Sequence, residues 1–305
     1  MKKHKKMTLN RKRALVGLLF ISPWLIGFLL FYLRSLIMTI NFSLSATEVY
    51  ESGGGYKNTF IGLDNFIYVF TKHGSFSETF TTSIMDIVID VPLIIFFSIF
   101  MALLLNKKFK GRTIVRAIFF LPVILNSEAI QTAMNFSANL MGGGLSSAAE
   151  EIKSSAASGV NLGYYIELFD DLGMPEKIID YIVSAVGRLS SIITSSGVQV
   201  VIFIAALQAV PSSMYEVAKI EGATGYEAFW KITFPMIMPH IITNIVYTVV
   251  DRFANSEVVK MSYATIFREQ NYALGSTMSL VSMLAVCAIL AVTCGIISKR
   301  TFYYN

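Results

Sequence analysis

Apolar residues are gathered along this chain into runs that are too long for the core of a soluble domain. A helix needs about 20 such residues to cross a hydrocarbon core of roughly 30 Å, because each residue adds about 1.5 Å. Runs of this kind predict an all-α, polytopic membrane protein with six transmembrane helices. The predicted spans are residues 14–40, 82–105, 114–136, 192–210, 236–256 and 275–297.

The composition agrees with a membrane location. Hydrophobic residues make up 54% of the 305 positions and charged residues only 15%, whereas about a quarter of the residues in a soluble domain are charged. Two spans are less clear from the pattern alone. The run 192–210 is short, and 236–256 contains Asp251 and Arg252.

Lys and Arg are distributed unevenly between the two sides that six spans would create. With the N-terminus inside, the four inner segments hold seven, five, two and two of them, which makes sixteen, and the outer segments hold seven. Cytoplasmic loops carry the excess of these residues. Both termini are therefore predicted to be cytoplasmic, and the net charge of +5 reflects topology, so nucleic-acid binding is not expected.

Residues 1–13 form a basic cytoplasmic segment in front of the first span. The combination could be a secretory signal peptide, but the apolar run is too long and no small-x-small cleavage site closes it. An uncleaved first span is therefore predicted, and residues 14–305 are assigned to one transmembrane domain.

Two outer segments are long enough to carry structure of their own. In residues 41–80 a glycine turn leads into an aromatic stretch, which predicts a small lobe or an interfacial helix. Residues 137–191 begin with a Gly, Ser and Ala-rich run and continue with apolar residues at helical spacing beside charged ones. That second part is predicted to be an amphipathic helix at the outer membrane surface.

Polar side chains inside spans are costly and usually face a cavity or each other. They fall at steps of three and four within the third and fifth spans, so that each set shares one helix face. Interhelical hydrogen bonds, or an ion pair between Arg252 and an acid, are the structural alternatives to a substrate pathway. The pathway candidates are Glu128, Gln131, Asn135, Asn244, Tyr247, Asp251, Arg252 and Asn255.

The segment 211–235, between the fourth and fifth spans, predicts two short helices. Ser213 stands three residues before Glu216, and Thr224 stands three before Glu227, which are two capping-box patterns. Gly222 between them is a usual helix stop. The helices are too short to cross a membrane, so their aromatic residues need another surface, and a cytoplasmic partner protein is one candidate. Helix capping alone is the alternative role for the two glutamates.

Several catalytic motifs are absent from the sequence. It has no G-x-x-x-x-G-K-[ST] phosphate loop, so it is not expected to hydrolyse nucleotide by that route. It has three histidines and no H-E-x-x-H pattern, which argues against a zinc protease, and no metal site is predicted.

The stretch EVAKIEGATGYEAFWKITFP, with the LQAVPSSMY before it, resembles the EAA loop of ABC-importer permeases, in the carbohydrate branch that includes the maltose-type sugar permeases. FIGLDNF at 60–66 and ALLLNKKFKGRTIVRAIFFLP at 102–122 resemble the same branch. Val217 and Phe234 are mild departures from the EAA pattern. The outer loop before the last span lacks the usual T-G-G-G-P run, and the 137–191 loop is enlarged. These outer departures bear on the substrate.

The resemblance implies a type I ABC importer permease fold with a cytoplasmic coupling helix. In such permeases the EAA loop docks in a cleft of a separate ATPase subunit. It implies a bacterial cell-membrane location and the following partners: a second permease subunit, two ATPase subunits that hold ATP and Mg, an extracytoplasmic solute-binding protein, and lipid. The chain itself would hold no cofactor. The residues carried over for coupling to the ATPase are Glu216, Ala218, Gly222, Ala223, Ile232 and Pro235.

The expected function is therefore transport of a carbohydrate, a di- or oligosaccharide, without enzymatic activity in this chain. Three alternatives remain open. The solute could be another polar molecule, or the chain could be a secondary transporter that needs no ATP. It could also be a membrane-embedded enzyme that uses Asp86, Asp90 or Glu128 as acid or base.

Overall fold

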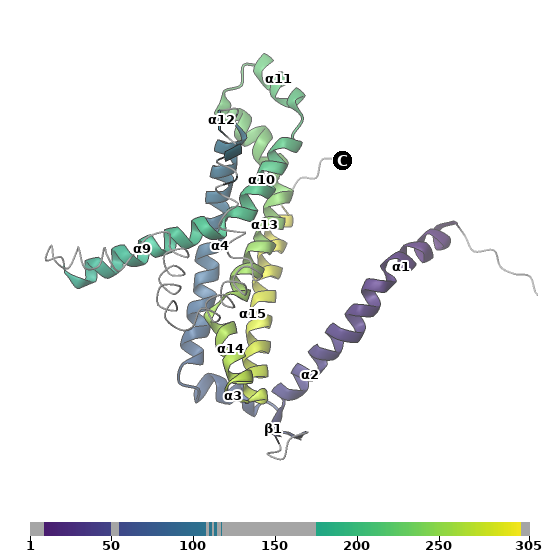
Figure 1. The fold of residues 1–305 in the computed structure, drawn as a ribbon. Coiled ribbons are helices and arrows are strands. Elements are labelled where there is room, and N and C mark those ends of the chain that lie inside the picture. The colour runs from purple at the N-terminus through teal and green to yellow at the C-terminus, as the bar shows by residue number, and fades with distance from the viewer. Residues whose placement is uncertain are drawn as a thin grey trace, which may run out of the picture. The chain divides into compact units, whose positions relative to one another are not determined.

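The computed structural model describes residues 9–49, 55–107, 110–111, 113–114, 117 and 175–299 (Figure 1). These residues are helical apart from one hairpin and the connecting turns. The chain divides into two compact units, one made of Met1–Ile84 and Ala254–Cys287 and the other of Met85–Phe253 and Ala288–Asn305. The units are described separately.

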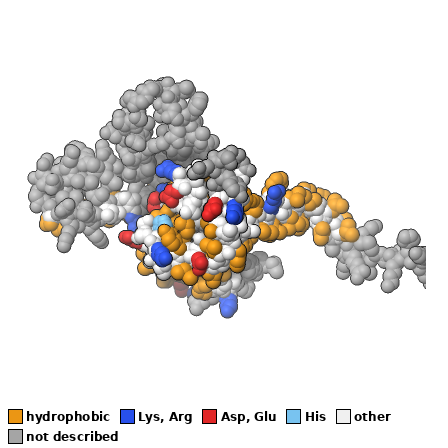
Figure 2. Space-filling model, turned by 90° about the horizontal axis from the view of Figure 1, so that it is seen from below, with side chains coloured by type: hydrophobic (Ala, Val, Ile, Leu, Met, Phe, Trp, Pro, Cys, Tyr) orange, Lys and Arg blue, Asp and Glu red, His pale blue; other side chains and the backbone are white. Residues whose placement is uncertain are grey.

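The first unit begins with a long apolar helix. It is built from α1 (Leu9–Gly27), the π-helical turn η1 (Phe28–Leu33) and α2 (Arg34–Ser43), which follow one another without a break. Its segment Leu15–Ser43 is long and apolar enough to cross a membrane, and none of its most apolar window is buried within the chain. Figure 2 shows that hydrophobic side chains predominate along this helix. Its surface is therefore suited to lipid or to another protein.

A hairpin and a short helix follow. Strand β1 (Ser45–Val49) pairs antiparallel with β2 (Tyr56–Phe60), and α3 spans Asp64–Thr71. The buried Asn65 fixes this lobe, because its Nδ2 donates to the carbonyl oxygens of Ser43 and Ser45, both at 3.0 Å. The structure thus contains both a small lobe and a short helix in the predicted outer segment. The hairpin is a local exception to the all-α expectation.

The other part of the first unit is formed by α14 (Glu257–Phe267) and the start of α15 (Tyr272–Ser298). These helices approach closely at Gly275. A Cβ atom there would lie 2.3 Å from Cγ1 of Ile266, which no side chain could tolerate without movement. Glycine is therefore required by the packing at this position.

The second unit contains most of α4 (Phe76–Asn106) together with α9 (Glu176–Ser195), α10 (Gly197–Ala209), α11 (Ser212–Ile220), α12 (Gly225–Ala228), η2 (Phe229–Thr233) and α13 (Phe234–Ala254). Figure 1 shows α4, α10 and α13 side by side. Hydrogen bonds join α10 to α13 and α4 to α13, so these helices form the packed centre of the unit.

The fourth predicted span, 192–210, differs from the observed helices. Helix α9 continues to Ser195, and α10 of 13 residues, about 20 Å long, is too short to cross a bilayer alone. Ser184–Ser195 and Gly197–Ala209 pass the span criteria together, with a bend of 50° between them. The predicted boundary between a surface helix and a span therefore falls inside one helix, and the break lies at Ser196.

Four single helices of the described residues are long and apolar enough to cross a membrane, and the bent pair makes five. The single ones are Leu15–Ser43, Phe76–Asn106, Gly225–Ala254 and Tyr272–Ser298. The predicted third span, 114–136, lies almost entirely outside the described residues, as does 137–174 of the long loop. The chain is thus a polytopic, predominantly helical membrane protein.

Candidate functional site

The segment between α10 and α13 contains a sharply terminated helix. The backbone N–H of Ala223 donates to the carbonyl oxygen of Ala218 at 2.9 Å, and the backbone N–H of Gly222 donates to the carbonyl oxygen of Lys219 at 3.1 Å. This pair of bonds is a Schellman motif, in which the residue after the helix is left-handed. Gly222 has φ of +76°, as the motif requires. The predicted glycine elbow is confirmed.

The second predicted capping box is also confirmed. The Thr224 backbone N–H donates to Glu227 Oε2 at 2.9 Å, and the Glu227 N–H donates to Thr224 Oγ1 at 3.3 Å. These bonds satisfy donors that a helix start leaves open. The start of α12 is therefore fixed by contacts between Thr224 and Glu227.

The first predicted capping box is wrong. Helix α11 begins at Ser212, with Pro211 in the N-cap position and no side-chain hydrogen bond to the cap. Because the helix starts two residues earlier than the pattern suggested, Ser213 lies within its first turn and cannot cap it. Glu216 lies in the middle of α11, where its exposed side chain is not needed to cap the helix.

Pro235, the last residue of the segment 211–235 that was predicted to hold two short helices, does not end the second helix. Helix α12 continues through η2 into α13, and Pro235 is the second residue of α13. Proline lacks an N–H and crowds the carbonyl four residues before it, and the wider π-helical turn at Phe229–Thr233 relieves that conflict. The short helix and the fifth span are therefore one continuous helix. Tyr215 of α11 contacts it through a 2.9 Å hydrogen bond between its hydroxyl and Thr233 Oγ1.

The surface of α11, α12 and η2 carries exposed apolar side chains. Ile220 is 86% exposed and Tyr226 is 73% exposed, and Val217 and Trp230 are each about half exposed. The motif residues divide between the surface and the interior: Glu216 is exposed, Ala218 is buried, and Ala223, Ile232 and Pro235 are half-buried. Aromatic and aliphatic side chains exposed together at a polar helix end are typical of a protein contact. We call Ser212–Ala228 the docking loop.

A buried polar row runs along α13 and meets α10. Gln199 Nε2 donates to Thr248 Oγ1 at 3.0 Å, and Thr248 donates to the Asn244 carbonyl at 2.7 Å. Asn244 is fully buried, and neither its amide nitrogen nor its amide oxygen has a partner among the described residues, nor does Gln199 Oε1. Unpaired buried polar atoms are rare because each costs about 1–3 kcal/mol. This row is therefore a place where a polar ligand or another polar chain would find partners.

The other pathway candidates differ in their surroundings. Tyr247 is 38% exposed and Asp251 is half-buried on the same side of α13. Asn255 follows the last residue of α13 and belongs to the other unit, so it does not extend the helical row. Glu128, Gln131 and Asn135 lie outside the described residues.

Arg252 is part of an ion network centred on Asp90. Asp90 of α4, 4% exposed, accepts a hydrogen bond from Arg252 of α13 and another from Arg188 Nε of α9 at 2.9 Å. Arg188 also donates to Asp86 at 3.2 Å, and Arg252 Nη1 donates to Ser191 Oγ at 3.0 Å. The structure thus contains the Arg252–acid pair that was the alternative to a pathway role. Arg188 was not a predicted site residue, because it falls in the segment 137–191 that was predicted to be an outer loop.

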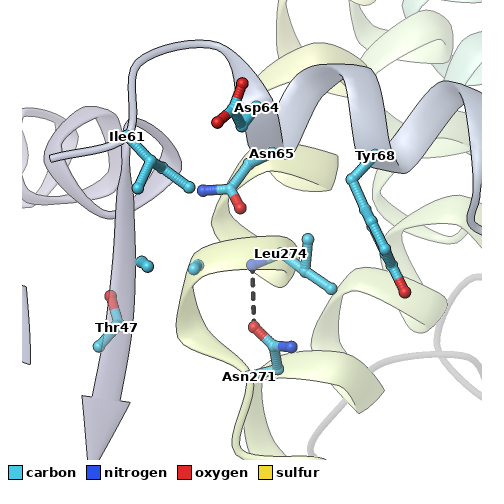
Figure 3. A pocket seen from close by; sticks show the side chains of 9 residues that line it. Thr47, Ile61, Asp64, Asn65, Tyr68, Asn271 and Leu274 are labelled. Carbon is cyan, nitrogen blue, oxygen red and sulfur yellow. Dashed lines mark hydrogen bonds between the residues drawn. The ribbon is translucent and has the colours of Figure 1, made fainter. Parts of the chain in front are cut away.

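The first unit holds a separate pocket of about 450 Å³ (Figure 3). Its polar wall is formed by Thr47, Asp64, Asn65, Tyr68 and Asn271, from the hairpin, α3 and the start of α15. The Asn271 side chain accepts from the Leu274 N–H at 3.1 Å, which fixes that edge. None of these residues was a predicted site residue. Asp64 and Asn65 belong to the FIGLDNF stretch, and the fold brings the other residues to them.

Comparison with known proteins identifies one matching family and several related permease proteins. Residues 66–303 match the family described as binding-protein-dependent transport system inner membrane component. A probable ABC transporter permease protein, YesP, of Bacillus subtilis is 30% identical over 253 residues, covering 82% of this chain and 74% of that protein. A trehalose/maltose transport system permease protein, MalF, of Thermococcus litoralis is 26% identical, with coverages of 82% and 78%.

A solved structure shares the fold. A chain of a bacterial alginate ABC transporter, solved in complex with an alginate pentasaccharide-bound periplasmic protein, aligns with a TM-score of 0.59 at 17% identity. The alignment covers 96% of this chain and 97% of that one.

Proposed function

Because the chain belongs to the family of binding-protein-dependent transport system inner membrane components, we propose that it is a permease subunit of an ATP-driven importer for a di- or oligosaccharide. The docking loop is the observation that carries this proposal. It is a stiff, capped element that presents Glu216 and exposed apolar side chains, and its second helix is continuous with a membrane span. No flexible joint lies between α12 and the span, so a movement imposed on α12 is transmitted to the span.

The partner at the docking loop is a separate ATPase subunit. The chain has no phosphate-loop motif, so ATP and Mg are held by that partner and the permease itself is not an enzyme. Two ATPase subunits, a second, non-identical permease subunit and an extracytoplasmic binding protein complete the importer. Both termini and the docking loop lie in the cytoplasm, as the Lys and Arg distribution indicates.

The substrate class is supported by the relatives and by the chemistry of α13. The Thermococcus relative is named for trehalose and maltose, and the solved neighbour for alginate. Asn244, Tyr247 and Asp251 offer an amide, an aromatic ring and a carboxylate along α13, and sugars are bound by such groups through their hydroxyls and C–H faces. We assign these residues to the substrate pathway.

Another polar solute is the second candidate. Relatives named as sn-glycerol-3-phosphate permeases are 31–32% identical over 118 residues, although these matches cover only 33% of this chain. An assay of uptake with the importer's own binding protein separates the two, because the binding protein selects the solute before the permease meets it.

The coupling role is tested by a charge-removing substitution in the docking loop. In Glu216→Ala, we expect the permease to insert normally and the ATPase subunits to co-purify at about a tenth of the wild-type amount or less, since a charged contact at an interface is worth about 1–3 kcal/mol. Lys219→Gln is the matched control, because Lys219 is exposed on the same helix. Unchanged ATPase binding and uptake in Glu216→Ala would contradict the proposal.

A further inference from the structure

Asp90 is a buried carboxylate shared by two arginines from different helices. Its side chain is 4% exposed, whereas those of Arg188 and Arg252 are 40% and 23% exposed. Burying a charge is costly unless it is paired, and removing every partner leaves an uncompensated charge. Asp90 therefore needs an arginine in any arrangement of these helices, while each arginine can reach water.

One arginine is enough to neutralise Asp90, and Arg188 has a second acceptor. Asp86 lies four residues earlier on α4, about one helical turn or 6 Å away, and is 55% exposed. Arg188 already contacts it at 3.2 Å. Arg188 can thus move from Asp90 to Asp86 while Arg252 keeps Asp90 paired, so that no buried charge is left alone.

Arg188 lies on one side of a bend. It belongs to the Ser184–Ser195 half of the broken span, which meets α10 at 50°. Arg252 of α13 contacts the same half through Ser191. Arg188 lies eight residues before the break at Ser196, about 12 Å along the helix, so a change in the bend would move it relative to α4. Packed helices tend to have discrete relative positions.

We propose that Asp90 is a positioning residue for transport: through Arg188 and Arg252 it sets the angle of the broken span, and Asp86 takes over Arg188 when the angle changes. The proposal rests on the proposed function, since the bend has to change only if the span moves during transport. It assigns the charged residues of α4 a mechanical role and not contact with the solute.

The angle can be measured by electron paramagnetic resonance distances. Spin labels are placed at Leu189→Cys on α9 and Val88→Cys on α4, both at exposed positions, in a chain whose Cys287 and Cys294 are replaced by Ser. The permease is measured in lipid nanodiscs, alone and with its partner subunits, before and after trapping with ATP and vanadate. We expect two distance populations whose ratio changes on trapping.

The substitutions at the two acids should affect different states: those at Asp90 the nucleotide-free state, and those at Asp86 the trapped state. In Asp90→Asn the nucleotide-free ratio should shift by about tenfold toward the trapped population, because Arg188 loses its buried acceptor. Asp90→Glu should keep the wild-type ratio. In Asp86→Asn the nucleotide-free ratio should be unchanged and the trapped population should fall. A residue that only stabilises the fold would change the yield of folded protein and not this ratio.

The proposal is overturned if Asp90→Asn has the wild-type ratio, or if Asp86→Asn shifts it in the same direction. Because the nucleotide-free ratio is measured on the permease alone, this result does not depend on ATPase binding. Loss of ATPase binding in the wild-type complex would instead contradict the proposed function. If Asp90→Asn does not fold, the trapped population of Asp86→Asn decides the question: a population equal to that of the wild type overturns the proposal.

Discussion

Single glycines are needed in this structure for two different physical reasons. Gly222 has a left-handed backbone, and no atom lies within 4 Å of the place that a Cβ would take, so its constraint is conformational. Ala in that conformation costs roughly 1–2 kcal/mol, Asn costs less, and a β-branched residue costs more. We expect ATPase co-purification to fall in the order Gly222→Asn, Gly222→Ala, Gly222→Val. Equal binding by all three would show that the elbow is not required.

Gly275 is constrained by packing. In Gly275→Ala the new Cβ would meet Ile266 Cγ1 at 2.3 Å and the Ser262 carbonyl oxygen at 3.1 Å. Overpacking of this kind costs about 1–3 kcal/mol. We expect Gly275→Ala to lower the melting temperature of the purified permease, as measured by light scattering or intrinsic fluorescence. Gly295→Ala in the same helix has open space and is the control, which should melt at the wild-type temperature or above.

At the scale of helices, Thr224 caps α12, the part of the docking loop that continues into a span. Thr224→Ala removes the two capping bonds that use the Thr224 hydroxyl, one to the Glu227 N–H and one to Glu227 Oε2, which costs about 1 kcal/mol. The backbone N–H of residue 224 can still donate to Glu227, and Thr224→Ser retains all three bonds. Because α12 continues into α13, fraying should stay local: the first turn should exchange its amide hydrogens faster in Thr224→Ala, while exchange along α13 is unchanged. Faster exchange throughout α13 would contradict local fraying and would mean that the cap supports the whole span.

Helix-scale features differ in how far the sequence predicts them. The glycine elbow and the Thr224 capping box were predictable because they depend on residues within four positions of one another. The start of α11 and the continuity through Pro235 were not, since Pro211 as N-cap and the π-helical turn are adjustments of the backbone. The break at Ser196 was also missed, because apolar residues continue across it and no proline or charge marks the 50° bend in the sequence.

At the scale of the whole molecule, membrane class and family were predictable and the arrangement of charges was not. Hydropathy and one spaced motif sufficed for the class, since span length and positive charge in loops are properties of segments. The ion network joins residues 98 to 162 positions apart in the chain. No periodicity links Asp90 to Arg188 or Arg252, so only the folded chain shows that these charges neutralise one another.

The orientation of the whole chain is a prediction from its Lys and Arg distribution, and it can be tested directly. Phe60 in the hairpin is 78% exposed and Tyr226 in the docking loop is 73% exposed. With Cys287 and Cys294 replaced by Ser, a membrane-impermeant maleimide should label Phe60→Cys in intact cells and Tyr226→Cys only after the membrane is permeabilised. The two positions have similar exposure, so the difference in labelling reports sidedness. Labelling of Tyr226→Cys in intact cells would reverse the topology and remove the docking loop from the side where ATP is available.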